Sequence, residues 1–210
     1  MQFLVTAFKP YDQWEQNSSW LALQRWLHDF VGGVDLITRL YPVDLLELES
    51  RLQQDLQLQP DAVLHVGQSP GSPVVAVEEI ALNAAGMVEE AGTSLPPLVA
   101  NGPVAYRTTA AAGVLAKRLA ESGIPASVSY HAGTFLCNAV FYLSHHLLRQ
   151  RGSSAPVVFL HLPLAVEQVV GRSGHRLASL PLPLLAQAID VACAHLVEVV
   201  TGQVASRDMA

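Results

Sequence analysis

Apolar runs alternate with amphipathic stretches along most of the chain. Apolar runs of about four to eight residues bounded by turn residues are typical of buried strands, whereas apolar positions three and four residues apart indicate helices. This pattern predicts strands over residues 3–8, 35–43, 62–66, 74–82, 126–130 and 157–162. It predicts one helix that begins near Ser18 or Ser19, one that carries Cys137, and further helices over 44–56, 110–122 and 184–200.

The alternation of strands and helices is typical of an α/β protein. Several of the predicted strands are apolar on both faces, so helices should cover both sides of the sheet. We therefore expect a single domain over residues 1–210, folded as a three-layer α/β/α sandwich with a mixed, largely parallel central sheet. By composition, 67–71 is predicted to be a loop and 86–103 to be irregular. In sheets of this kind, function gathers at the strand ends.

The composition of the chain excludes some classes of binding partner. The chain has 210 residues, of which 50% are hydrophobic, and a formal net charge of −6. It has no cluster of Lys and Arg, so the charge pattern of a nucleic-acid-binding protein is missing. It also lacks a signal-peptide pattern at its N-terminus and any run of about eighteen uncharged apolar residues. We therefore expect a soluble cytoplasmic protein that acts on a neutral or small substrate and binds neither nucleic acid nor membranes.

The cysteines and histidines do not form a recognisable metal site. Cys137 and Cys193 are the two cysteines, and in a chain without an export signal both are expected to be reduced. No Cys-x-x-Cys or His-x-x-x-His spacing occurs, so the sequence predicts no metal ligands.

Cys137 has the most informative surroundings in the chain. The segment 129–144 leads it through a tight turn into the first turn of a helix, and Gly133 and Thr134 suit the turn and the N-cap. Unpaired N–H groups and the helix dipole at such a position favour a thiolate. Free cysteine is also often a small buried hydrophobe, so position alone leaves both readings open.

Two further groups are candidates to act with this thiol. His161 closes an apolar strand and would bring a base to the rim that Cys137 occupies, although a structural histidine at a strand end is the alternative. Glu78 and Glu79 lie inside an apolar run, where neighbouring side chains point to opposite faces. A third group must orient the histidine, and only one of these two carboxylates can face it. An exposed edge position is the alternative for these carboxylates.

These segments resemble the pyroglutamyl-peptidase I family, also called pyrrolidone-carboxylate peptidases, which are cysteine peptidases with a Glu, Cys, His triad. The resemblance covers nearly the whole chain, and the register of the Glu-x-x-Ala-x-Asn segment selects Glu78 over Glu79. The segments that carry it are 132–138 with Cys137, 159–163 with His161, 78–83, the Gly-Gln loop at 66–68, and 6–11 followed by 17–20.

The resemblance implies an α/β/α enzyme without a metal or other cofactor that removes N-terminal pyroglutamate from peptides. Cys137 would attack the carbonyl, His161 would protonate the departing amine, and Glu78 would orient His161. Backbone N–H groups at the helix start would stabilise the oxyanion, and water would hydrolyse the acyl-enzyme. The family is commonly homotetrameric and cytoplasmic, and Trp20 and Trp26 with the last helix could contribute to a subunit contact.

The resemblance also implies the substrate pocket. A pyroglutamyl ring is a neutral lactam, so its pocket needs apolar walls and a few amide-type hydrogen bonds. Phe8 and Tyr11 would flank the ring, and Gln68 would stand near the loop that shapes the site.

Several positions depart from the family pattern. Tyr11 replaces a phenylalanine, and its added hydroxyl must find a partner if it is buried, which could narrow the pocket or shift its preference. The other departures are Ala7, Asp12, Ser18, Ser72, the segment 86–92 and the pair 110–111. They leave two alternatives open: a binding or assembly homologue without turnover, and a cysteine amidohydrolase for a different small amide. A phosphate-dependent nucleoside enzyme is not favoured, since no glycine-rich phosphate loop is present.

Overall fold

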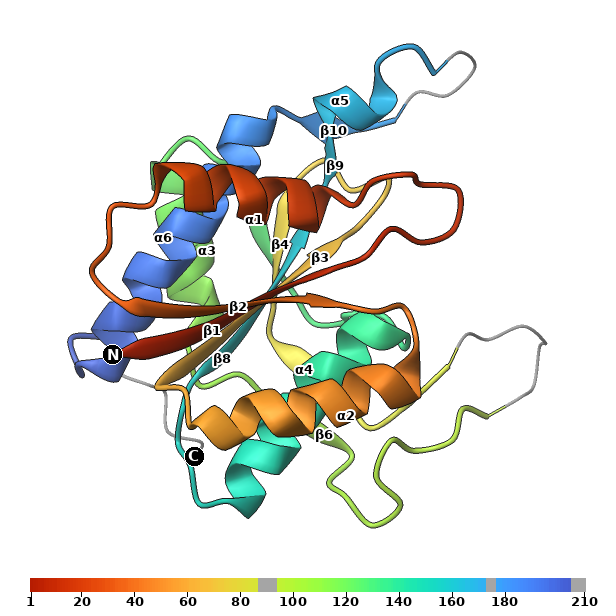
Figure 1. The fold of residues 1–210 in the computed structure, drawn as a ribbon, viewed down its shortest axis with the longest axis vertical. Helices are drawn as coiled ribbons and strands as arrows, with labels where there is room; N and C mark the ends of the chain where they lie inside the picture. Colours follow the sequence, from red (N-terminus) through yellow and green to blue (C-terminus); the bar gives the residue numbers. More distant parts are fainter. Residues whose placement is uncertain (87–93, 173–176, 205–210) are drawn as a thin grey trace.

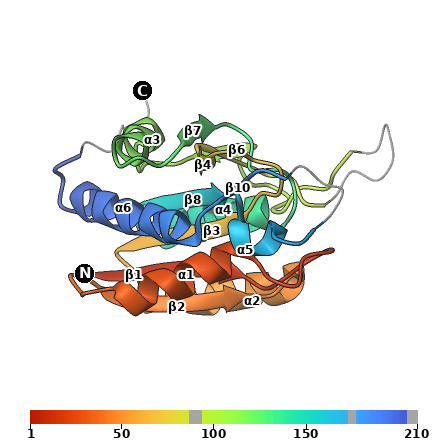
Figure 2. The ribbon, with the colours of Figure 1, turned by 90° about the horizontal axis from the view of Figure 1, so that it is seen from above.

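A six-stranded sheet with helices on both faces forms the centre of the molecule. The computed structural model describes residues 1–86, 94–172 and 177–204. Figures 1 and 2 show the sheet between two layers of helices, so the predicted α/β/α architecture is confirmed. The strand order across the sheet is β2 (Asp35–Tyr41), β1 (Gln2–Phe8), β3 (Ala62–Gln68), β8 (Val157–Leu162), β4 (Val75–Glu78) and β7 (Ala126–Ser129).

The sheet is mixed, as predicted, because its direction reverses once. β2, β1, β3 and β8 run parallel to one another, whereas β4 runs antiparallel to β8 and parallel to β7. The two directions meet between β8 and β4, where His161 and Glu78 lie.

Each face of the sheet packs on its own set of helices. The helices α1 (Ser18–Asp29), α3 (Ala112–Glu121) and α6 (Leu182–Val200) cover one face, and α2 (Leu45–Asp55) and α4 (Leu136–Gln150) cover the other (Figures 1 and 2). In β1, Phe3 and Val5 join the core beneath the first set, while Leu4 and Phe8 join the core beneath the second. Because both faces are buried, the strands are apolar throughout instead of alternating.

The last helix is part of the core. α6 is long and apolar enough, by length and composition, to cross a membrane. It packs instead along α1, where Trp26 Nε1 donates a hydrogen bond to Asp190 at 3.0 Å. Trp26 and the inner face of α6 are therefore buried within the chain, whereas Trp20 is only partly buried. The expectation that Trp20, Trp26 and the last helix contribute to a subunit contact stays a prediction. The homotetramer and the cytoplasmic location stay predictions.

The predicted strand over 74–82 is in fact two strands in different sheets. β4 ends at Glu78, and β5 (Ile80–Leu82) pairs antiparallel with β6 (Ala105–Arg107), which the pattern did not predict. The break is at Glu79, whose N–H donates to the Ser129 carbonyl at 2.7 Å and whose carbonyl accepts from Thr108 N–H at 3.0 Å. These bonds complete β4 beside β7 and direct the chain into the second sheet.

Other boundaries differ by a few residues. The loop predicted at 67–71 begins after Gln68, because Gly67 and Gln68 still pair with β8. Of the segment 86–103, residues 87–93 lie outside the described residues, and 94–103 contain no helix or strand, as predicted. Four further elements are too short to leave a period in the sequence and were not predicted: the 3-10 helix η1 (Leu56–Leu58), β9 (Leu164–Ala165), α5 (Val166–Val169) and β10 (Ser179–Leu180).

A buried histidine ties three elements together behind the site. The ring of His65 is fully buried and bonds the Thr6 hydroxyl at 2.7 Å and the Ser144 hydroxyl at 2.8 Å. Burial, with a smaller contribution from the nearby His145, lowers the pKa of His65 to about 3, so the ring is neutral at physiological pH. This bridge joins β1 and β3 to α4, the helix that carries Cys137.

Candidate active site

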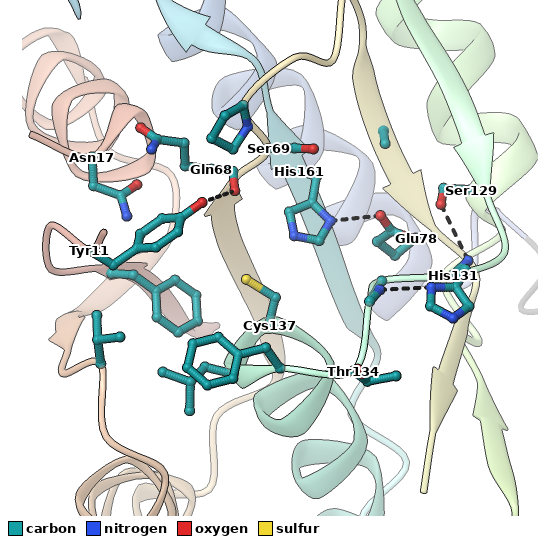
Figure 3. A pocket seen from close by; sticks show the side chains of 18 residues that line it. Tyr11, Asn17, Gln68, Ser69, Glu78, Ser129, His131, Thr134, Cys137 and His161 are labelled. Atoms are coloured by element: carbon teal, nitrogen blue, oxygen red, sulfur yellow. Dashed lines mark hydrogen bonds and ion pairs between the residues drawn. The ribbon is translucent and has the colours of Figure 1, made fainter. Parts of the chain in front are cut away.

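All six residues predicted for the site line one cavity. The cavity has a volume of about 450 Å³ and lies at the carboxyl ends of β3 and β8. Glu78, Cys137 and His161 lie close together in it, with Tyr11 and Gln68 to one side (Figure 3). Phe8 also lines the cavity. The fold thus brings together groups that are separated by up to about a hundred and fifty residues in sequence.

Cys137 occupies the first turn of α4, as expected, but the cap differs. The N-cap is Phe135, and no side chain caps the helix. Thr134, which we expected to be the cap, instead donates its hydroxyl hydrogen to the Gly86 carbonyl at 2.8 Å. The first-turn N–H groups therefore have no side-chain cap, which leaves them available to an oxyanion.

Gly67 allows the backbone of β3 to pass directly beside the sulfur of Cys137. A Cβ atom at this position would lie 3.0 Å from Cys137 Sγ and 2.8 Å from Phe159 Cζ. Separations this short are not tolerated by ordinary side chains, so only glycine leaves both groups in place. The sequence pattern showed the Gly-Gln pair but not this steric reason for it.

Glu78 and His161 form a buried pair across the antiparallel β4–β8 ladder. Ala76 lies opposite His161, so Glu78 is its diagonal neighbour on the same face of the sheet. The Glu78 carboxylate accepts a hydrogen bond from His161 Nδ1 at 2.7 Å and is 2% exposed. Figure 3 shows the imidazole between this carboxylate and Cys137. Glu79 points away and pairs with Arg107, so the structure places Glu78 in the cavity.

The charges around His161 favour its protonated form. Burial of the ring lowers its pKa, but the interactions with Cys137 and with Glu78 outweigh burial and raise the pKa of His161 to about 9. The imidazole is therefore mainly an imidazolium at neutral pH. A cation beside the sulfur is the arrangement that stabilises a thiolate.

Aromatic side chains form one end of the cavity. Phe8 is held by tilted or edge contacts with Tyr41 and Phe159. The Tyr11 hydroxyl donates a hydrogen bond to the Gln68 carbonyl at 3.3 Å, which is the partner that its burial requires. Burial and the nearby Cys137 raise the pKa of Tyr11 to about 12, so this wall stays uncharged. Val43 and Phe135 also line the cavity.

The side chain of Gln68 is turned away from Cys137 toward α1 (Figure 3). Its Oε1 accepts hydrogen bonds from Ser18 N–H and from Gln168 Nε2, each at 2.7 Å. Gln168 is 8% exposed and also donates to the Gln16 carbonyl at 2.9 Å. Gln68 therefore presents its backbone to the cavity, and its amide ties the surrounding loops together. Sequence reasoning missed Gln168, because no local pattern marks a bond across a hundred residues.

Two asparagines of the resembling segments have structural roles that the sequence alone did not indicate. Asn138, next to the candidate nucleophile, accepts from Leu82 N–H at 2.8 Å and donates to the Leu82 and Ala84 carbonyls at 2.9 and 3.0 Å. Asn83 exchanges hydrogen bonds with the backbone of Val99. The first turn of α4 is thus fastened to β5.

Across the described ranges, no group of three or more His, Cys, Asp or Glu side chains could hold a metal ion.

Comparison with known proteins decides the family. The family model described as pyroglutamyl peptidase matches residues 1–199. The chain belongs to the pyroglutamyl peptidase family. It is therefore a peptidase, and the resemblance seen in the sequence is confirmed.

Curated relatives and solved structures agree with this family. A pyrrolidone-carboxylate peptidase of Pectobacterium carotovorum subsp. carotovorum is 37% identical over 193 residues, which cover 90% of this chain and 89% of the relative. The pyrrolidone carboxyl peptidase from Thermococcus litoralis superposes with a TM-score of 0.87 at 25% identity, covering 100% of this chain and 99% of that one. The corresponding enzyme from Fervidobacterium islandicum AW-1 gives 0.87 at 29% identity, with 94% and 99% covered.

We predict that Gly67→Ala lowers kcat at least about tenfold, because the added methyl group displaces Cys137 Sγ or the Phe159 ring beside it. The measurement is steady-state hydrolysis of a pyroglutamyl amide, with thermal unfolding to show that the variant is folded. Gly113→Ala in α3 is the matched control, since nothing lies within 4 Å of its added Cβ. We expect the control to keep its activity and to gain up to about 1 kcal/mol in stability. Unchanged kcat in Gly67→Ala would contradict the steric argument.

Proposed function

We propose that this peptidase removes N-terminal pyroglutamate from peptides, with Cys137 as nucleophile, His161 as acid and base, and Glu78 as the residue that orients His161. The observation that carries the proposal is the cavity in which these three groups meet beside an uncharged aromatic end. Membership of the pyroglutamyl peptidase family supports the same substrate.

The reaction follows from the positions of the groups. The thiolate of Cys137 attacks the carbonyl that joins pyroglutamate to the next residue, and first-turn N–H groups of α4 stabilise the oxyanion. His161 gives its proton to the departing amine as the carbon–nitrogen bond breaks, which leaves a thioester on Cys137. His161 then takes a proton from water, and the resulting attack releases pyroglutamate and restores the thiolate. Glu78 holds the ring through Nδ1 during both steps.

The aromatic end suits a lactam better than a free amino terminus. In the described part of the chain, the lining near Tyr11 contains no charged side chain that could pair with an ammonium group. A free N-terminus would have to lose its hydration there without a counter-charge, which is costly. A pyroglutamyl ring has no such charge and gains contact with the apolar walls formed by Phe8 and Tyr11.

We predict turnover of a fluorogenic pyroglutamyl amide by the wild-type protein under reducing conditions with a chelator present, and its loss in Cys137→Ala. The matching prolyl and alanyl amides should be cleaved at least about tenfold less efficiently, because each brings a charged amine into the uncharged end. The measurement is kcat/KM for the three substrates. A preference for the prolyl or alanyl amide would overturn pyroglutamyl recognition, and equal turnover by Cys137→Ala would overturn the nucleophile.

We also predict that kcat/KM falls at alkaline pH as His161 loses the proton that it gives to the leaving amine, with a midpoint near the pKa of about 9. Glu78→Gln removes a charge that raises this pKa, so the alkaline limb should move to lower pH and kcat should fall about a hundredfold or more. Glu79→Gln is the matched control, since Glu79 pairs with Arg107 outside the cavity. If the alkaline limb of the pH profile shifted by the same amount in Glu78→Gln and Glu79→Gln, the assignment of Glu78 would be contradicted.

A further inference from the structure

The cavity continues beyond the catalytic groups to a second end, which is polar. Ser129, His131, Gly133 and Thr134 line this end. They belong to the segment that leads from β7 into α4. Figure 3 shows His131 on the far side of Glu78 from His161, whereas Tyr11 lies on the opposite side of Cys137. The reacting groups thus separate an aromatic end from a polar end.

His131 is fixed in place by bonds within its own loop. Its Nδ1 accepts a hydrogen bond from Gly133 N–H at 3.0 Å, and its backbone N–H donates to the Ser129 hydroxyl at 3.3 Å. Because Nδ1 is an acceptor, the neutral ring carries its hydrogen on Nε2. A ring held in this way loses little rotamer freedom when it binds a ligand. His131 is exposed, so this donor is accessible from the cavity mouth.

We propose that His131 is a specificity-determining residue that binds the amino acid following pyroglutamate, by donating Nε2–H to a carbonyl or carboxylate oxygen of that residue. This rests on the proposed function: with the pyroglutamyl ring at the aromatic end and its carbonyl over Cys137, the leaving residue must extend toward the polar end. The ligand class is an oxygen acceptor, because the exposed Nε2–H of His131 is a hydrogen-bond donor when Nδ1 accepts from Gly133 N–H.

The consequence is a difference between substrate types. An arylamide such as pyroglutamyl β-naphthylamide has no oxygen on its leaving group, whereas pyroglutamyl-alanine amide has a carbonyl and pyroglutamyl-alanine has a carboxylate. Only the last two can accept a hydrogen bond from His131. Loss of one such bond corresponds to roughly a three- to tenfold change.

The experiment measures kcat/KM for these three substrates in the wild type, His131→Ala and His131→Asn. The asparagine Oδ1 can still accept the Gly133 N–H, so this variant keeps the turn, but its amide does not reach the position of Nε2. We expect both variants to lose about three- to tenfold on the alanine-containing substrates and to keep the wild-type rate on the arylamide. A loss on both alanine substrates assigns the carbonyl as the acceptor, and a loss on pyroglutamyl-alanine alone assigns the carboxylate. Tyr130→Ala is the control, because Tyr130 is exposed beside His131 and does not line the cavity.

Any of four results would overturn the proposal. Equal losses of kcat/KM on all three substrates would show that His131 only shapes the loop. Wild-type kcat/KM values for all three substrates in His131→Asn would show the same. No loss on any substrate would show that the ring makes no contact with the leaving residue. If the wild-type protein cleaved none of the substrates, the proposed function itself would fail, and this subsite with it.

Discussion

The buried pair of Glu78 and His161 is the constraint on which the site depends. A carboxylate that is 2% exposed is costly unless it is paired, and the imidazolium of His161 is its partner at 2.7 Å. The pair forms because β4 runs against β8, which makes the two residues diagonal neighbours on one face. A fully parallel sheet would not give this register, so the single reversal of direction in the sheet has a direct chemical consequence.

The sulfur of Cys137 comes from a different element, α4, and three features of the structure determine its position. Asn138 fastens the first turn of α4 to β5, and the hydroxyl of Ser144 bonds the buried ring of His65 further along the helix. Gly67 then lets β3 pass beside the sulfur without a side chain between them. The hydrogen bonds of Asn138 and Ser144, together with the absence of a side chain at Gly67, thus position Cys137 beside His161 on the central sheet.

Much of this arrangement follows from local sequence, because buried strands leave continuous apolar runs and amphipathic helices leave a clear period. The strand ending near His161 and the helix start at Cys137 were both predicted, and the Glu78 register came from the family resemblance. The division of 74–82 into β4 and β5 could not be predicted, since the run is apolar throughout and the break depends on bonds from Glu79 to Ser129 and Thr108. The cap at Phe135 was missed because Thr134 finds a partner in a distant loop. Gln168 was missed for the same reason, as its bonds join segments far apart in the chain.

The most direct test of this account is to trap the covalent intermediate. Wild-type protein is mixed with a pyroglutamyl arylamide, quenched in acid within the first turnover, and digested for peptide mass spectrometry. We expect a pyroglutamyl thioester on the peptide that contains Cys137 and none on the peptide that contains Cys193, which is buried in the core. Turnover of the substrate at its normal rate, with Cys137 unmodified at every quench time from the first turnover onward, would contradict it.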